Sequence, residues 1–243
     1  MTDVNSLTAI GDDRARVLEA DGVQMLFAFG PGNPARPPEN RMSRLMADPG
    51  VQVAAIRWGE QVHGRIVASL AAQPDQPVEK IACVGRCDAL MTAEPGVGLV
   101  VWTADCVPIL IRGGDVVAAV HSGWRGTVAD VAGAVVRRFA IEYGVPASNL
   151  NAVLGPAISG SKYEVSGEVI EGLRVFGLDE KRWLEQKHVD LRGFLAARFE
   201  DLGLESKKID IVGPCTASTP ELASYRREGA EAGRQWSMIY RVC

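Results

Sequence analysis

Short apolar runs rich in valine and isoleucine are the feature that most limits what this chain can fold into. Four of them occupy residues 51–58, 98–103, 107–111 and 116–120. Continuous runs of this length, bounded by Gly and Asp, are typical of strands buried on both faces. Gly113, Gly114 and Asp115 separate the last two runs, as expected of a hairpin turn. A sheet that contains such a hairpin is not purely parallel.

Helical periodicity follows the hairpin. Residues 127–143 carry an apolar stripe at helical spacing, with Thr127 and Asp130 resembling a capping box and Gly144 a C-terminal stop. The pattern also predicts helices over 165–175 and 190–202, and a helix start at Thr219.

The remaining apolar segments are short. Residues 151–154, 209–212 and 236–241 are predicted strands. Because strands and helices interleave around a hairpin, we expect an α/β (α+β) fold with mixed sheets. We expect residues 1–243 to form one domain, with the Pro- and Gly-rich segment 30–40 as a surface loop near its N-terminal end.

Composition excludes several classes of protein. Of 243 residues, 47% are hydrophobic and 23% charged, which is typical of a globular protein and not of a disordered one. The net charge of -4 argues against a broad basic surface for nucleic acid, and no run of about 18 apolar residues predicts a membrane helix. Five scattered cysteines and an acidic N-terminal segment favour a cytoplasmic protein with reduced thiols. Oligomeric state is left open.

Three residues with metal-binding side chains lie just beyond apolar runs. His63, Cys106 and His121 each follow one, so strands placed side by side in one sheet would bring the three side chains to one rim. His and Cys are good zinc ligands, and three protein ligands leave a position for water or substrate. Each residue alone is more often structural, and no HExxH motif or CxxC pair strengthens the pattern, so the residues themselves leave both interpretations open.

Six longer motifs add a resemblance. They are QVHG at 61–64, CDALMT at 87–92, TADCVPIL at 103–110, HSGWRGT at 121–127, GPAISGSKYEV at 155–165 and SYRREG at 224–229. In this order they resemble the YfiH-type family, also called laccase-domain or multicopper polyphenol oxidase proteins and described as purine nucleoside phosphorylases. The similarity runs from about residue 40 to the C-terminus.

The resemblance implies a zinc ion bound by His63, Cys106 and His121, with copper as the other metal to consider. It implies a layered fold like that of the cytotoxic necrotizing factor toxins. The implied activities are phosphorolysis of adenosine, inosine, guanosine and methylthioadenosine, and deamination of adenosine; peptidoglycan precursor editing is attached to bacterial relatives. The chain departs from the family in FAFGPGNPARPP, which replaces an Arg- and Gly-rich segment, so we assign no phosphate contact there.

Three further residues are candidates for binding substrate. Arg125, four residues after His121, is expected to hold phosphate or a developing anion, with a structural salt bridge as the alternative. Arg226 is a second candidate, unless it only faces solvent on a helix. Tyr163 is expected to contact a nucleoside, unless it is a core tyrosine. His188 carries no motif and is interpreted as a surface or capping residue.

Three functions therefore compete. The first is a zinc-dependent nucleoside phosphorylase with deaminase activity, whose partners are purine nucleosides and phosphate. The second is a metal-free hydrolase or deamidase, in which Cys106 is the nucleophile and His121 the base. The third, a copper-dependent polyphenol oxidase, is weakest because the chain has only three histidines. A closed structural zinc site usually has four ligands.

Overall fold

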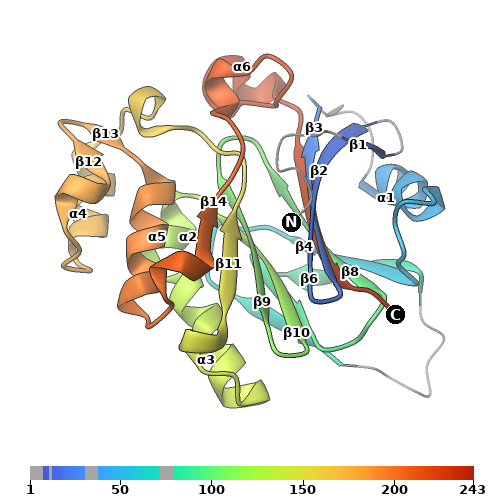
Figure 1. Cartoon of the computed structure of the whole chain (residues 1–243). Coiled ribbons are helices and arrows are strands. Elements are labelled where there is room, and N and C mark those ends of the chain that lie inside the picture. The colour runs from blue at the N-terminus through green and yellow to red at the C-terminus, as the bar shows by residue number, and fades with distance from the viewer. Residues whose placement is uncertain (1–7, 11–12, 31–37, 72–78) are drawn as a thin grey trace.

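Two mixed β-sheets packed face to face form the centre of the structure (Figure 1). The computed structural model describes residues 8–10, 13–30, 38–71 and 79–243. The predicted mixture of parallel and antiparallel strands with interleaved helices is confirmed. Several helices pack on the outer face of the second sheet and one described helix, α1 (Pro38–Ala47), packs on the first, which gives a layered α/β arrangement (Figure 1).

The first sheet has seven strands, and its order brings the two ends of the chain together. The order is β1 (Thr8–Ile10), β2 (Asp13–Ala20), β3 (Val23–Phe29), β15 (Gln235–Arg241), β8 (Val97–Thr103), β4 (Ala55–Glu60) and β6 (Ile81–Arg86). Strand β15 lies antiparallel between β3 and β8, while β4 is parallel to both of its neighbours.

The second sheet has six strands and contains the predicted hairpin. Its order is β14 (Ile209–Ile211), β11 (Asn151–Leu154), β9 (Val107–Gly113), β10 (Val116–Ser122), β7 (Ala89–Thr92) and β5 (Val67–Leu70). Strands β9 and β10 pair antiparallel, and almost all of their residues are buried, as the continuous apolar runs predicted. A two-stranded ribbon, β12 (Leu184–Glu185) and β13 (His188–Val189), lies outside both sheets.

Three apolar layers follow from this stacking. The layer between the sheets contains Phe27 and Leu99 of the first sheet together with Leu110 and Val117 of the second. A larger layer joins the second sheet to its helices, namely α2 (Trp124–Val128), α3 (Val131–Tyr143), α4 (Gly167–Arg174) and α5 (Leu191–Asp201). The third joins the first sheet to α1 (Pro38–Ala47).

Some sequence predictions need correction. Thr127 does not cap the long helix: it lies inside α2, and Asp130 caps α3 by accepting a hydrogen bond from the Gly133 amide. Thr219 starts no helix, because the next helix, α6 (Tyr225–Glu228), is capped by Ser224. The strand predicted over 51–58 is displaced to Ala55–Glu60.

The predicted loop 30–40 is only partly tested. Residues 31–37 lie outside the described residues, and the loop's last three positions belong to α1, whose first residue is Pro38. Proline suits the first turn of a helix because its missing amide hydrogen has no partner there anyway.

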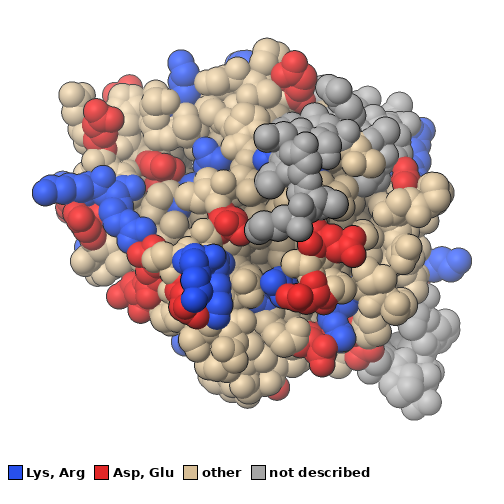
Figure 2. All heavy atoms as spheres, in the orientation of Figure 1, with Lys and Arg blue, Asp and Glu red and all other residues tan. Residues whose placement is uncertain are grey.

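The described surface carries charges of both signs. On the face in Figure 2, Lys and Arg are interspersed with Asp and Glu and do not gather into one basic area. None of the helices over the described residues combines the length and apolar character needed to cross a lipid bilayer.

Candidate metal centre and its cavity

The three predicted ligands converge, but from two sheets and not from one. His63 follows β4 of the first sheet, His121 lies near the end of β10 in the second, and Cys106 lies in the turn that joins β8 to β9. Their donor atoms all lie within 4.8 Å of one another. The expectation of a single sheet rim was therefore wrong, since the site lies where the chain passes from one sheet to the other.

Asp88 organises this cluster. It directly precedes β7, whose first residue pairs with Val120 of β10, so its buried carboxylate lies beside His121. Oδ1 accepts hydrogen bonds from Nδ1 of His121 (2.9 Å) and the amide of His63 (2.8 Å). Oδ2 accepts from the amides of Gly64 (2.7 Å) and Val62 (3.3 Å). One carboxylate thus holds two of the three ligands.

The main chain at His63 is held in an unusual conformation. Its φ of 59° lies in the left-handed region, which is costly for a residue with a side chain. Three successive amides, from Val62 to Gly64, point at the Asp88 carboxylate and form an anion-binding nest. The bonds to Asp88 offset the strain and fix the direction of the imidazole.

Gly123 lets the cluster close. A Cβ atom at this position would lie 2.7 Å from Sγ of Cys106 and 3.1 Å from Cδ2 of His63. The first contact would force a displacement at Cys106, and the second would press on the His63 ring, so both candidate ligands would be affected. The glycine of the HSGWRGT motif is therefore required by packing against two ligands.

Electrostatics favour a charged Cys106. Burial alone would raise the pKa of the Cys106 thiol, but His121 and His63 lower the pKa to about 6. Burial alone would lower the pKa of His121, but Asp88 and Cys106 raise the pKa to about 9. Burial likewise opposes ionisation of Asp88, yet its hydrogen bonds from His121 and Gly64 keep the pKa below the ordinary value. Both shifts favour a thiolate–imidazolium pair, held by a carboxylate, in the metal-free site.

The donor set fits a single metal ion. Nδ1 of His121 is engaged by Asp88, which leaves Nε2 for a metal, the carboxylate–histidine arrangement common behind zinc. Two imidazoles and one thiolate suit zinc, and also suit a mononuclear copper that has a weak axial Met or Gln ligand. No described Met lines the cavity, and both ends of the Gln61 side chain bind the main chain of Trp102. The three side chains thus offer two imidazole nitrogens and one thiolate to a single ion.

A cavity of about 790 Å³ opens over the three ligands. Arg125 lines it, is exposed, and stacks its guanidinium 4.3 Å from the Trp124 ring. No carboxylate among the described residues forms a salt bridge with Arg125, so the structural alternative raised from the sequence has no support there. The guanidinium remains available to an anion in the cavity.

Tyr163 and Arg226 lie together on another wall of the cavity. The Arg226 guanidinium lies 5.2 Å from the Tyr163 ring and donates to the carbonyl oxygens of Glu164 (3.0 Å) and Lys162 (3.4 Å). Burial raises the pKa of Tyr163 to about 12, so its hydroxyl stays protonated. Both residues line the cavity, and Arg226 also has structural bonds.

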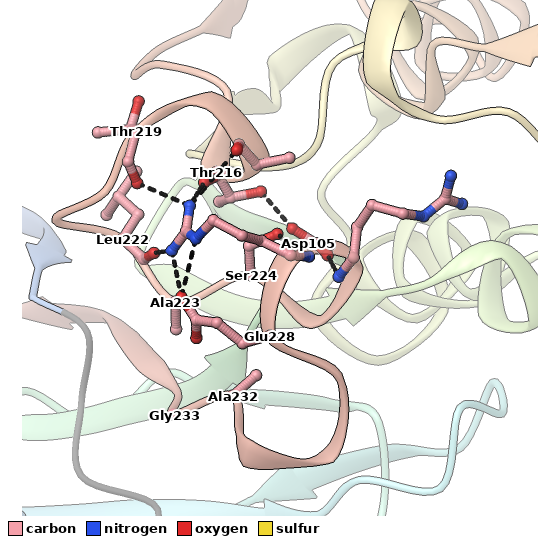
Figure 3. A network of polar contacts seen from close by, with 12 residues as sticks. Asp105, Thr216, Thr219, Leu222, Ala223, Ser224, Glu228, Ala232 and Gly233 are labelled. Carbon is pink, nitrogen blue, oxygen red and sulfur yellow. Dashed lines mark hydrogen bonds and ion pairs between the residues drawn. The ribbon is translucent and has the colours of Figure 1, made fainter.

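Arg227 has a structural role that the sequence did not reveal. Its guanidinium donates to the carbonyls of Thr216 (2.8 Å) and Thr219 (3.1 Å), and also to that of Leu222 and to the Glu228 carboxylate. Figure 3 shows these groups arranged around one guanidinium. The arginine thus fixes the segment that runs past the cavity toward α6.

The other reactive side chains stay outside the cluster. His188, in β13, is half-buried and is absent from the only group of three or more potential ligands found among the described residues. Cys83 is exposed and Cys87 is buried, with burial raising the pKa of the Cys87 thiol to about 11. Sequence reasoning missed the role of Asp88, whose only signal was its place inside the CDALMT motif.

Comparison with known proteins agrees with the motifs. The chain is 36% identical over 215 residues to a purine nucleoside phosphorylase of Mycobacterium bovis, covering 86% of this chain and 80% of the relative. It is 35% identical over 158 residues to one of Deinococcus radiodurans, covering 63% of this chain and only 60% of that protein's length.

Solved structures support the fold. A hypothetical protein YfiH of Bacillus licheniformis superposes with a TM-score of 0.84 at 21% identity, covering 98% of this chain and 99% of that one. YlmD of Geobacillus stearothermophilus gives a TM-score of 0.80 at 24% identity, covering 99% of this chain and 100% of that one.

The model of one family, described as multi-copper polyphenol oxidoreductase laccase, matches residues 32–242. The chain belongs to this multi-copper polyphenol oxidoreductase laccase family, which includes the YfiH-type proteins.

Proposed function

We propose that this chain is a zinc-dependent purine nucleoside phosphorylase that also deaminates adenosine. The observation that carries the proposal is the convergence of His63, Cys106 and His121 within 4.8 Å at the base of a cavity that also exposes Arg125. Relatives named purine nucleoside phosphorylase, at 35–36% identity, support the reaction class. The proposed substrates are adenosine, inosine, guanosine, methylthioadenosine and phosphate.

Zinc is proposed over copper because of the donor set. The family description names several coppers, which require many histidines, whereas this chain has three. Zinc held by the three side chains would supply a Lewis acid able to activate a nucleophile or polarise the leaving base. Asp88 keeps Nε2 of His121 pointed at the cluster, which is what such a ligand needs.

The cavity walls supply binding groups for a nucleoside and an anion. We assign phosphate to Arg125, because its guanidinium has no competing carboxylate among the described residues and presents forked donors. We assign the nucleoside to the side of Tyr163 and Arg226, where an aromatic ring with a protonated hydroxyl lies beside a cation. Deamination would use the same cavity with another atom under attack: water adds at C6 of adenine and ammonia leaves, whereas phosphate attacks C1′ of the ribose and the base leaves.

A metal-free cysteine hydrolase is the second candidate. The lowered pKa of Cys106, the raised pKa of His121 and the Asp88 carboxylate behind it match the nucleophile, base and orienting group of a catalytic triad. The same arrangement suits a zinc site, so metal content separates the two candidates. We further propose a cytoplasmic location, supported by five cysteines without a disulfide.

The test is to incubate the protein with adenosine, inosine or methylthioadenosine, with and without phosphate, and to measure free base, ribose phosphate and ammonia. The proposal predicts base release that requires phosphate, and ammonia only from adenosine. His63→Ala, Cys106→Ala and His121→Ala should lose both activities in parallel, because all three hold one ion. Base release at the same rate with and without phosphate, or no base release at all, would refute the phosphorylase assignment.

A further inference from the structure

Asp105, the residue before Cys106, has a conformation that its surroundings must enforce. Its φ is 82°, in the left-handed region, and its side chain is buried with 8% exposure while still lining the cavity. A non-glycine residue persists there only where surrounding contacts outweigh the strain, and such residues gather at functional sites. The hydrogen bonds of Asp105 show which parts of the chain this conformation holds together.

Asp105 bonds to three distant parts of the chain. Oδ1 accepts from the Thr216 hydroxyl (2.5 Å), and Oδ2 accepts from the Arg226 amide (2.6 Å). The Asp105 carbonyl accepts from the amide of Ile158 (3.1 Å). Figure 3 shows the Thr216 side chain turned toward Asp105.

We propose that Asp105 is a positioning residue that holds the Cys106 sulfur and the Arg226 wall of the cavity in one fixed arrangement. Cys106 follows Asp105 directly, so the left-handed turn sets the direction in which its thiol leaves the chain. Arg226 is bound through its main-chain amide, and its guanidinium lies beside the Tyr163 ring. One carboxylate therefore ties a metal ligand to a substrate-binding wall. The proposal rests on the zinc site proposed above.

Two substitutions of Asp105 separate the effect of its side-chain hydrogen bonds from the effect of its backbone conformation. Asp105→Asn tolerates the left-handed conformation, and its oxygen can accept from Arg226 while its amide donates to the Thr216 hydroxyl, so both bonds survive. Asp105→Gly adopts the conformation freely but loses both bonds. Measured by competition with a chromogenic chelator, zinc affinity should stay within about threefold for Asp105→Asn and fall about tenfold or more for Asp105→Gly.

The controls exclude simple destabilisation. Asp130 is a second aspartate in the left-handed region (φ 63°); it is bonded to Arg198 and does not line the cavity. Asp130→Ala should lower the thermal unfolding midpoint and leave zinc affinity unchanged. Thr216→Val removes one bond to Asp105 and should give an intermediate loss. Arg226→Ala keeps its amide bond to Asp105 and should bind zinc as the wild type does.

A second readout keeps the proposal testable without metal. In zinc-free protein, the rate at which iodoacetamide labels Cys106 should change at least about threefold in Asp105→Gly and stay near wild type in Asp105→Asn and Asp130→Ala. Should the wild type bind no zinc, the proposed function fails and this rate still decides the positioning role. Wild-type zinc affinity and labelling rate in a folded Asp105→Gly variant would overturn the proposal, as would an equal loss in Asp130→Ala.

Discussion

Replacing Asp88 should damage both the stability and the metal affinity of this protein. Three donors lie 2.7–2.9 Å from its carboxylate, namely the amides of His63 and Gly64 and Nδ1 of His121. A buried donor left without its acceptor costs about 1–3 kcal/mol, and water from the cavity offsets part of this loss. We therefore expect Asp88→Ala to lower the free energy of unfolding by about 3–5 kcal/mol, a large share of the 5–15 kcal/mol typical of a domain.

Asp88→Asn gives the finer test of the same reasoning. The asparagine amide has only one accepting oxygen, and its NH₂ group would face N–H donors that it cannot bond. We therefore expect the free energy of unfolding to fall by about 2 kcal/mol. Urea unfolding of zinc-free protein at pH 7 measures both variants, and chelator competition should show zinc affinity reduced about 10–100-fold. Asp115→Ala, which removes one carboxylate with 84% side-chain exposure and a surface ion pair, should cost about 0–1 kcal/mol.

The pH dependence has a defined sign. Because the pKa of Asp88 is lowered in the folded protein, its ionisation stabilises the fold above its ordinary pKa of 3.8, and this contribution is lost as the pH falls through the folded pKa. The difference in the free energy of unfolding between the wild type and Asp88→Ala should therefore become smaller as the pH falls below about 4. Losses under about 1 kcal/mol for both variants, with zinc affinity intact, would refute the organising role of Asp88.

The remaining predictions concern the thiol, the anion and the third histidine. Iodoacetamide should label Cys106 slowly in the zinc-loaded protein and faster after chelation. In the metal-free protein, the labelling rate measured by peptide mass spectrometry should rise as the pH passes about 6 and then level off. A rate that still increases at pH 9 would contradict the lowered pKa of Cys106. Arg125→Ala should raise the KM for phosphate about 10–100-fold, which corresponds to the loss of one charged hydrogen bond, and the KM for inosine much less. If steady-state kinetics show equal changes in the two KM values, Arg125 does not belong to the anion site. His188→Ala should leave zinc content unchanged by elemental analysis, and a loss like that of His63→Ala would show the ligand set to be wrong.

Local patterns predicted the parts of the fold that depend on local physics. The hairpin β9–β10 and the body of α3 follow from continuous apolar runs and a helical stripe, and both are confirmed. The hairpin β2–β3 carried an equally local signal that was missed: Asp21 and Gly22 both have positive φ, as an Asp-Gly hairpin turn requires.

Long-range pairing carried no such signal. Strand β15 pairs with β3 across some two hundred residues, and nothing near either strand specifies the other. The three candidate ligands could be predicted because His and Cys are themselves metal-binding side chains, whereas the contact of Asp88 with His121 depends on the pairing of β7 with β10. Likewise Asp105 gained its role from Thr216 and Arg226, which lie more than a hundred positions away.

A zinc titration tests the central claim most directly. Zinc-free protein would be supplied with increasing zinc while phosphate-dependent release of hypoxanthine from inosine and the bound zinc are measured in the same samples. The account predicts activity that rises in proportion to occupancy, reaches its maximum near about one zinc per chain, and is absent at every zinc concentration in Cys106→Ala. Full activity in metal-free protein, or activity that appears only with copper, would contradict it.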